Sequence, residues 1–201
     1  IKKIDFDGID AILSVSPYYN KPSQEGIYLH YKALADACPV PILLYNVPSR
    51  TGSTIAPETV IRLSIHPNII GIKEASGNLV SCIEIARKKP ADFLLISGDD
   101  ILTVPIMSIG GVGVISTLAN ALPKQMVAMV QAALNKDFQL AAEHQFELFP
   151  LHQLIMQGGN PVATKQMLAI LGVCKNYVRL PLASVATSFI EQMQAVMQPW
   201  L

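Results

Sequence analysis

The sequence predicts an α/β protein built on a parallel sheet. Short apolar runs, each about as long as a strand and rich in Ile, Leu and Val, recur along its first 121 residues. They lack the alternation expected for a strand with one wet face, so they are typical of parallel strands covered on both faces. The expected strands are DAILSVS (10–16), PILLYN (41–46), NIIGIK (68–73), FLLIS (93–97) and GVGVIS (111–116).

Amphipathic segments with a helical period separate these runs. Alternating strand and helix predicts a parallel sheet made of βα units. Pro57 and Glu58 mark one helix start, because proline suits the first helical turn and an acidic side chain there interacts favourably with the helix dipole. The expected helices cover residues 23–37, 56–65, 78–89 and 100–110.

Beyond Ala121 the pattern becomes helical only. The helices expected there cover residues 123–135, 138–157, 161–172 and 183–198. We therefore predict two regions, residues 1–121 with five βα units and residues 122–201 as a C-terminal helical region.

An open doubly wound sheet and a barrel of eight βα units both fit this alternation. A nucleotide-binding open sheet needs a glycine-rich turn between a strand and a helix. Here GGVG (110–113) precedes its apolar run, so it is expected to end a helix and enter a strand. The sequence therefore favours a TIM (β/α)8 barrel followed by C-terminal helices. Because such barrels need eight strands and roughly 250 residues, we expect about the first three βα units to be absent from this chain, as in a fragment or a processed product.

The composition excludes several function classes. Fifteen basic and fifteen acidic residues cancel, and neither sign forms a block, which argues against partners such as nucleic acid or an anionic membrane. No apolar run approaches the roughly 18 residues of a membrane span. Cys38, Cys82 and Cys174 show no metal-ligand spacing and are expected to be buried in a protein of a reducing, cytoplasmic compartment. The histidines show no paired ligand spacing either, so no metal is expected.

Lys73 ends an apolar run and is followed at once by a polar turn. Spacing alone favours a strand-end lysine that reaches solvent. Alternation along the strand would place Ile69, Gly71 and Lys73 on one face, where the glycine would leave room for the lysine stem. If the lysine is buried, desolvation lowers its pKa and makes it a nucleophile toward a carbonyl carbon. This second interpretation predicts Schiff-base chemistry.

Tyr45 and Arg50 support the second interpretation. Tyr45 ends the preceding expected strand, so its phenol would lie beside Lys73 and could pass a proton during carbinolamine formation. Packing of its ring alone would also explain it. Arg50, in the following loop, offers a planar fork suited to a carboxylate, although most loop arginines are simply solvated.

Several motifs then resemble one family. YNVPSRTG (45–52) and GIKEASGN (71–78) are similar to the dihydrodipicolinate synthase (4-hydroxy-tetrahydrodipicolinate synthase) family, and the similarity continues over essentially the whole chain. Its members are pyruvate-dependent, Schiff-base-forming lyases of the class I aldolase type, from lysine and diaminopimelate biosynthesis. They are (β/α)8 barrels with C-terminal helices, usually homotetramers built from dimers. The resemblance implies that pyruvate and L-aspartate 4-semialdehyde are the substrates, with no cofactor.

The resemblance also implies residue roles. Lys73 would form the Schiff base with pyruvate, with Tyr45 as general acid and base. Arg50 would bind the carboxylate of the second substrate. Tyr19 would match a relay tyrosine inserted from a neighbouring subunit. Gly98 and Ile115 would match positions where the backbone approaches the substrate.

Some alternatives remain open on sequence grounds. The family's Gly-Thr-Thr-Gly-Glu segment, which positions pyruvate, should precede Ile1, so the chain is expected to be inactive and unstable unless that part is supplied. N-acetylneuraminate lyases and 2-keto-3-deoxy sugar acid aldolases share the lysine and the tyrosine, and Arg50 is the discriminating residue. A non-catalytic truncated barrel is a further alternative, which the intact Lys73 and Tyr45 disfavour.

Overall fold

The computed structural model describes Ile1 and residues 3–201. Contacts divide the chain into two compact units, Ile1–Ile115 and Ser116–Leu201. The sequence placed the boundary after Ala121, six residues later, because its helical pattern starts only beyond that residue, whereas the second unit already includes the short 3-10 helix Leu118–Asn120.

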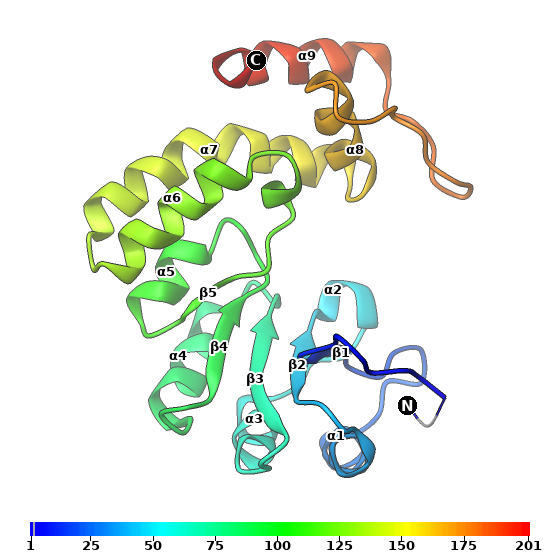
Figure 1. The fold of residues 1–201 in the computed structure, drawn as a ribbon, viewed down its shortest axis with the longest axis vertical. Helices are drawn as coiled ribbons and strands as arrows, with labels where there is room; N and C mark the ends of the chain where they lie inside the picture. The colour runs from blue at the N-terminus through cyan, green and yellow to red at the C-terminus, as the bar shows by residue number, and fades with distance from the viewer. Residues whose placement is uncertain (2) are drawn as a thin grey trace. The chain divides into compact units, whose positions relative to one another are not determined.

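The first unit is a parallel sheet whose strands alternate with helices. Its strands pair in chain order, each parallel to the next, and Figure 1 shows them side by side. This confirms the predicted α/β class. The strands are β1 (Ile12–Val15), β2 (Ile42–Asn46), β3 (Ile69–Glu74), β4 (Leu94–Ser97) and β5 (Gly113–Val114). The helices are α1 (Gln24–Ala37), α2 (Pro48–Thr51), α3 (Pro57–Ser64), α4 (Leu79–Lys88) and α5 (Thr103–Ser108).

Side-chain caps define the starts of two of these helices. Ser23 accepts a hydrogen bond from the backbone N–H of Gly26 at the start of α1, and Asn78 accepts one from Ser81 at the start of α4. Each cap satisfies a backbone donor that has no partner inside the helix. The short helix α2 was not expected, since PSRT carries no apolar periodicity.

The core of the first unit lies between the helices and one face of the sheet. Ile27 and Tyr31 of α1 pack in one cluster with Leu44, Ile72 and Leu95 of the central strands, together with residues of α3, α4 and α5. Because side chains alternate along a strand, Tyr45 and Lys73 belong to the opposite face.

A β-bulge in β3 corrects one expectation. Ile42 pairs with Ile69, whereas the next residue of β2, Leu43, pairs with Gly71. The extra residue reverses the alternation, so Ile69 is buried in the helix-side core. The prediction that Ile69 shares a face with Lys73 is therefore wrong.

The glycine-rich segment before β5 behaves as predicted. Gly110 has φ +101°, a conformation that side chains other than glycine rarely adopt. A Cβ on Gly111 would lie 2.7 Å from the carbonyl oxygen of Ile106. The segment ends α5 and leads into the last strand, and it precedes the strand instead of opening a helix.

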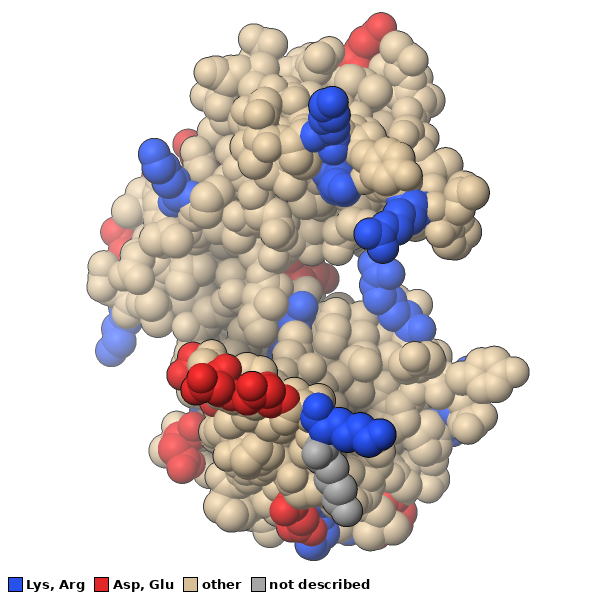
Figure 2. Space-filling view, turned by 45° about the vertical axis from the view of Figure 1, so that its right-hand side comes forward, with Lys and Arg blue, Asp and Glu red and all other residues tan. Residues whose placement is uncertain are grey.

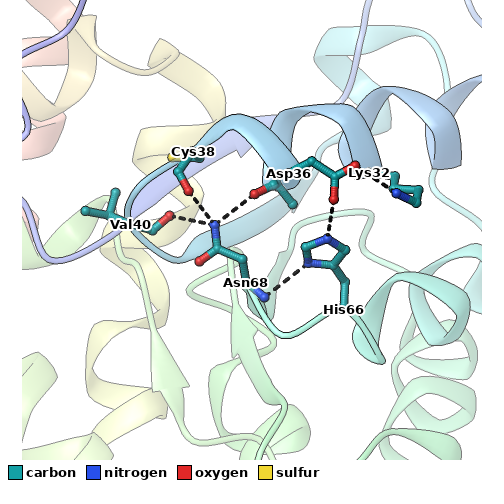
Figure 3. A network of polar contacts seen from close by, with 7 residues as sticks. Lys32, Asp36, Cys38, Val40, His66 and Asn68 are labelled. Atoms are coloured by element: carbon teal, nitrogen blue, oxygen red, sulfur yellow. Dashed lines mark hydrogen bonds and ion pairs between the residues drawn. The ribbon is translucent and has the colours of Figure 1, made fainter. Parts of the chain in front are cut away.

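The turn before β3 is joined to the end of α1 by polar contacts (Figure 3). Nδ2 of Asn68 donates to the carbonyl oxygens of Ala35, Cys38 and Val40 at 3.0, 2.8 and 3.2 Å. Nδ1 of His66 accepts the backbone N–H of Asn68 at 3.1 Å, and its Nε2 lies 3.1 Å from Oδ1 of Asp36. The Asn68 contacts with Ala35 and Cys38 satisfy carbonyls at the end of α1 that have no partner inside the helix.

The second unit is helical, as predicted. Its helices are η1 (Leu118–Asn120), α6 (Pro123–Leu134), α7 (Phe138–Gly158), α8 (Val162–Ile170), α9 (Thr187–Met197) and η2 (Gln198–Trp200). Met129, Leu151, Met167 and Met193 are fully or almost fully buried in it. The helix expected from residue 183 begins only at Thr187, and its first expected residues have no regular structure.

The surface charge agrees with the prediction from sequence, whereas the burial of the cysteines agrees with it only in part. Basic and acidic side chains are scattered among other residues on the face shown in Figure 2. None of the helices in the described part of the chain combines the length and the hydropathy needed to cross a membrane.

Cys38 and Cys82 are buried, but Cys174 is exposed, so the prediction of three buried cysteines is wrong for Cys174. It lies beyond α8, in a segment without regular structure.

Candidate active site

Lys73 and Tyr45 meet at the carboxyl-terminal edge of the sheet. They are register partners on β3 and β2. Nζ of Lys73 lies 4.3 Å from the centre of the Tyr45 ring. Both side chains are half-buried. A primary amine and a phenol therefore share the face of the sheet that is opposite the helices.

Gly98 leaves the space that the lysine stem occupies. It follows β4, and a Cβ there would lie 3.0 Å from both Cγ and Cε of Lys73 and 2.7 Å from Cβ of Ala75. The sequence assigned this space to Gly71, which is wrong. A Cβ on Gly71 would instead meet the Leu94 carbonyl oxygen at 2.6 Å and Cδ2 of Leu43 at 2.9 Å.

Burial sets the electrostatics of Lys73. Desolvation lowers the pKa of its amine below the ordinary value of 10.5, and the negative charge of Asp100 partly opposes this shift. Asp100 lies just beyond Gly98 and is itself buried. A lower pKa increases the neutral fraction of the amine, which is the nucleophilic form.

Arg50 is five residues after Tyr45 but belongs to a helix and not to a strand. It is in α2, the short helix that follows β2 directly, and it is exposed. The helix ends at Gly52, whose φ is 69° and whose N–H donates to the Pro48 carbonyl. Because α2 follows β2 directly, residue 50 lies beyond the same edge of the sheet as Lys73.

Tyr19 follows β1 at that edge and is strongly exposed. Its side chain is 89% exposed, and that of Tyr18 is 65% exposed. Tyr19 has φ 67°, a left-handed conformation that is uncommon for a residue other than glycine. Its large aromatic side chain lies in solvent and not in the core of this chain.

Gly98 and Ile115 contribute backbone at the ends of β4 and β5. The N–H of Gly98 donates to the Glu74 carbonyl at 2.7 Å, and the N–H of Ile115 donates to the Ser97 carbonyl at 2.9 Å. Both N–H groups thus extend the strand pairing. Contact of these backbones with a substrate, as the resemblance implies, would involve their other atoms.

Two buried polar residues at this edge were missed by the sequence analysis. Asn46 and Glu74 directly follow Tyr45 and Lys73, and their exposed fractions are 1% and 2%. A polar residue that ends a buried strand next to a candidate catalytic residue was the available signal.

Within the described residues, no group of three or more His, Cys, Asp or Glu side chains is placed to hold a metal ion.

Comparison with known proteins relates the chain to one family. The model of the dihydrodipicolinate synthetase family matches residues 2–199. The 4-hydroxy-tetrahydrodipicolinate synthase of Cytophaga hutchinsonii is 50% identical over 194 residues, which are 96% of this chain and 65% of that protein. The chain thus spans slightly less than two thirds of the length of this relative.

Solved structures show the same relationship. The crystal structure of dihydrodipicolinate synthase from Aquifex aeolicus superposes with a TM-score of 0.92 at 36% identity, over 96% of this chain and 66% of that one. A structure described as the first monomeric dihydrodipicolinate synthase variant superposes with a TM-score of 0.92 at 35% identity, over 95% of this chain and 65% of that one. The match along nearly the whole chain, in sequence and in structure, places this chain in the dihydrodipicolinate synthetase family.

Proposed function

We propose that the protein is a Schiff-base-forming lyase, a 4-hydroxy-tetrahydrodipicolinate synthase that condenses pyruvate with L-aspartate 4-semialdehyde in lysine and diaminopimelate biosynthesis. The observation that carries the proposal is the partly buried Lys73 amine, 4.3 Å from the centre of the Tyr45 ring at the carboxyl end of a parallel sheet. The names of the relatives support the same reaction. A cytoplasmic location belongs to this proposal.

The chemistry follows from the two side chains. The neutral amine of Lys73 adds to the keto carbon of pyruvate, and the carbinolamine loses water to give a protonated imine. Tyr45 is placed to give the departing hydroxyl group its proton and to take one from the nitrogen. The Tyr45 phenolate left by loss of water then accepts a methyl proton from the imine, which gives an enamine whose carbon attacks the aldehyde carbon of the second substrate.

The other candidates take supporting roles. Arg50 would bind the carboxylate of aspartate semialdehyde through its planar fork. Tyr19 would act as a proton relay in the site of a neighbouring subunit, which its exposure supports. This role requires a homo-oligomer, and we propose a tetramer built from dimers.

Trapping with borohydride tests the proposal directly. The full protein is incubated with pyruvate and borohydride, and peptide mass spectrometry locates the reduced adduct. We expect the adduct on Lys73, its loss in Lys73→Ala, and its retention in Lys124→Ala, a matched control at an exposed lysine of α6. An adduct that persists in Lys73→Ala, on another lysine, would contradict the assignment.

The second substrate separates this function from its alternatives. Arg50→Ala is expected to raise KM for aspartate semialdehyde while pyruvate trapping continues at the parent rate. Loss of pyruvate binding alone would contradict the role given to Arg50.

Cleavage of N-acetylneuraminate or of a 2-keto-3-deoxy sugar acid, without condensation of aspartate semialdehyde, would favour a sister aldolase. An intact protein with no adduct would favour a non-catalytic barrel.

A further inference from the structure

Two polar side chains are buried directly behind the Lys73–Tyr45 pair. Asn46 follows Tyr45, Glu74 follows Lys73, and the two are register partners. Because side chains alternate along a strand, both belong to the helix-covered face, opposite to that of Lys73. Nothing in the proposed reaction uses them. They lie behind the reacting groups and not among them.

Glu74 is a carboxylate held by hydrogen-bond donors. Nδ2 of Asn46 donates to its two oxygens at 2.9 and 3.2 Å, and the N–H of Ser76 donates to Oε1 at 2.7 Å. Burial raises the pKa of Glu74, and these donors oppose the rise. A buried polar group needs such partners, since removing it from water is otherwise unfavourable.

The oxygen of the Asn46 amide holds the segment that follows α2, the short helix that carries Arg50. Oδ1 of Asn46 accepts the N–H of Ile55 at 3.0 Å and the hydroxyl of Thr54 at 3.4 Å. The carbonyl oxygen of Asn46 accepts the N–H of Ala75 at 2.8 Å. A single residue therefore joins the end of β2 to the end of β3 and to the loop after β2.

We infer that Asn46 and Glu74 are positioning residues, whose buried amide–carboxylate contact fixes the spacing of the strand ends that present Tyr45 and Lys73. The inference rests on the proposed Schiff-base function. Proton transfer between the amine and the phenol depends on their separation, and the two groups are attached one residue before the contact. Because a shift of about 1 Å can lower a rate about a hundredfold, a loosened contact slows the reaction without touching the substrate.

The contact requires a donor at position 46 and an acceptor at position 74. Asn46→Asp places two carboxylates within hydrogen-bond distance. In Glu74→Gln the new amide N–H faces another hydrogen-bond donor, either the side-chain amide of Asn46 or the backbone N–H of Ser76. The double variant Asn46→Asp/Glu74→Gln restores the match with the polarity reversed. Its glutamine amide donates to the new carboxylate and accepts from Ser76, and the new carboxylate still accepts the N–H of Ile55.

The test compares these variants in the full protein. We measure kcat, KM for pyruvate, and the rate at which borohydride traps pyruvate on Lys73. Each single variant is expected to lower kcat and the trapping rate about tenfold to a hundredfold. The double variant is expected to recover both rates to within about threefold of the parent, as coupled residues do in a double-mutant cycle.

Asn68→Asp is the matched control for lost stability. It makes the same substitution at an amide that donates to the carbonyls at the end of α1, before the opposite end of β3. It is expected to lower the thermal midpoint and to leave kcat per folded molecule unchanged. An equal fall of kcat in this control would attribute the effect to stability and overturn the inference.

The remaining outcomes separate this inference from the proposed function. Single variants with parental rates, or a folded double variant that recovers neither rate, overturn the inference alone. If the single variants do not fold, the double variant decides: folded and active supports the inference, folded and slow overturns it. A parent protein that traps no pyruvate overturns the proposed function, and this inference with it.

Discussion

At Gly98 the absence of a side chain provides the space for the Lys73 stem. A methyl group there would lie 3.0 Å from two carbons of the lysine and 2.7 Å from Cβ of Ala75. Such contacts are closer than packed carbons tolerate, so either the lysine rotates or the loop after β4 shifts. The lack of a side chain at Gly98 therefore controls where the amine nitrogen of Lys73 lies. This role does not depend on contact between the Gly98 backbone and a substrate.

We expect Gly98→Ala to lower the rate of pyruvate trapping about tenfold to a hundredfold and to reduce the free energy of unfolding by about 1–3 kcal/mol. Trapping kinetics and denaturant titration measure the two effects. Gly26→Ala is the control, because a Cβ there would come no closer than 3.3 Å to another atom. Trapping at the parent rate in Gly98→Ala would show that the lysine does not need this space.

The charge of Asp100 is expected to adjust the reactivity of Lys73. Burial lowers the pKa of the amine, and the negative charge of Asp100 raises it again in part. In Asp100→Asn that opposing influence is removed, so the neutral amine forms at lower pH. We expect the pH profile of pyruvate trapping to move to lower pH, with no such movement in Asp92→Asn, at an exposed site. A movement to higher pH would contradict this sign.

The lowered pKa also has a consequence for stability. Lys73 binds fewer protons in the folded state than in the unfolded state between its folded pKa and the ordinary value of 10.5. Its contribution to the free energy of unfolding therefore becomes more favourable as pH rises through that interval. Below the interval, the folded protein bears the cost of a partly desolvated ammonium group. This cost accompanies the nucleophile that the proposed chemistry requires.

At the scale of elements, one asparagine joins a helix end to a strand start. The Asn68 amide donates to one carbonyl in the last turn of α1 and to two just beyond it, and β3 begins at the next residue (Figure 3). Asn68 thus stabilises the start of β3, which is the end of the strand remote from Lys73. The extra residue Ile70 and the Asn46–Glu74 contact set the register and the spacing of the other end of β3 beside β2.

Asn68→Ala is expected to lower the free energy of unfolding by about 1–3 kcal/mol, because partly buried carbonyls lose their donor. Chemical denaturation measures this change. Asn120→Ala, which removes one exposed amide hydrogen bond, should change stability by less than about 0.5 kcal/mol. Equal stability of the two variants would show that water replaces Asn68 at the end of α1.

At the scale of the whole molecule, the exposed Tyr18 and Tyr19 suit contact with another copy of the chain. Two adjacent aromatics in solvent are unusual at a site with no partner, and the proposed relay needs Tyr19 in a neighbouring site. In Tyr19→Phe we expect kcat to fall at least about tenfold, because a proton-transfer group is lost. Tyr18→Phe, which leaves the Tyr19 hydroxyl in place, should retain the parent rate. Sedimentation then checks that both variants keep the parent's assembly.

Mixing inactive variants tests whether Tyr19 acts between subunits. A hybrid of Lys73→Ala and Tyr19→Phe chains contains one site with Lys73 from one chain and Tyr19 from the other. If Tyr19 acts in a partner's site, activity returns on mixing, because that site is complete. If Tyr19 acts in its own chain, both kinds of site are defective and no activity returns.

Local sequence signals predicted much of the fold. Apolar runs and helical periods indicated all five strands and most helices, since burial on both faces leaves a continuous apolar pattern. The positions of Lys73 and Tyr45 at the ends of neighbouring strands followed from the same reasoning. The bulge at Ile70 could not be predicted in this way, because one additional isoleucine in an apolar run does not change the sequence pattern that indicates a strand. The exposure of Cys174 likewise depends on where its segment lies.

The sequence by itself determined the α/β alternation, the helical second part and the two residues proposed to carry the chemistry, because these depend on periodicity and on residue type. Only the tertiary structure decided which glycine makes room for Lys73, which face Ile69 occupies, and that Asn46 and Glu74 hold the strand ends together. Each of these depends on atoms of a different strand. A contact between residues far apart in the chain exists only once strand register has been set.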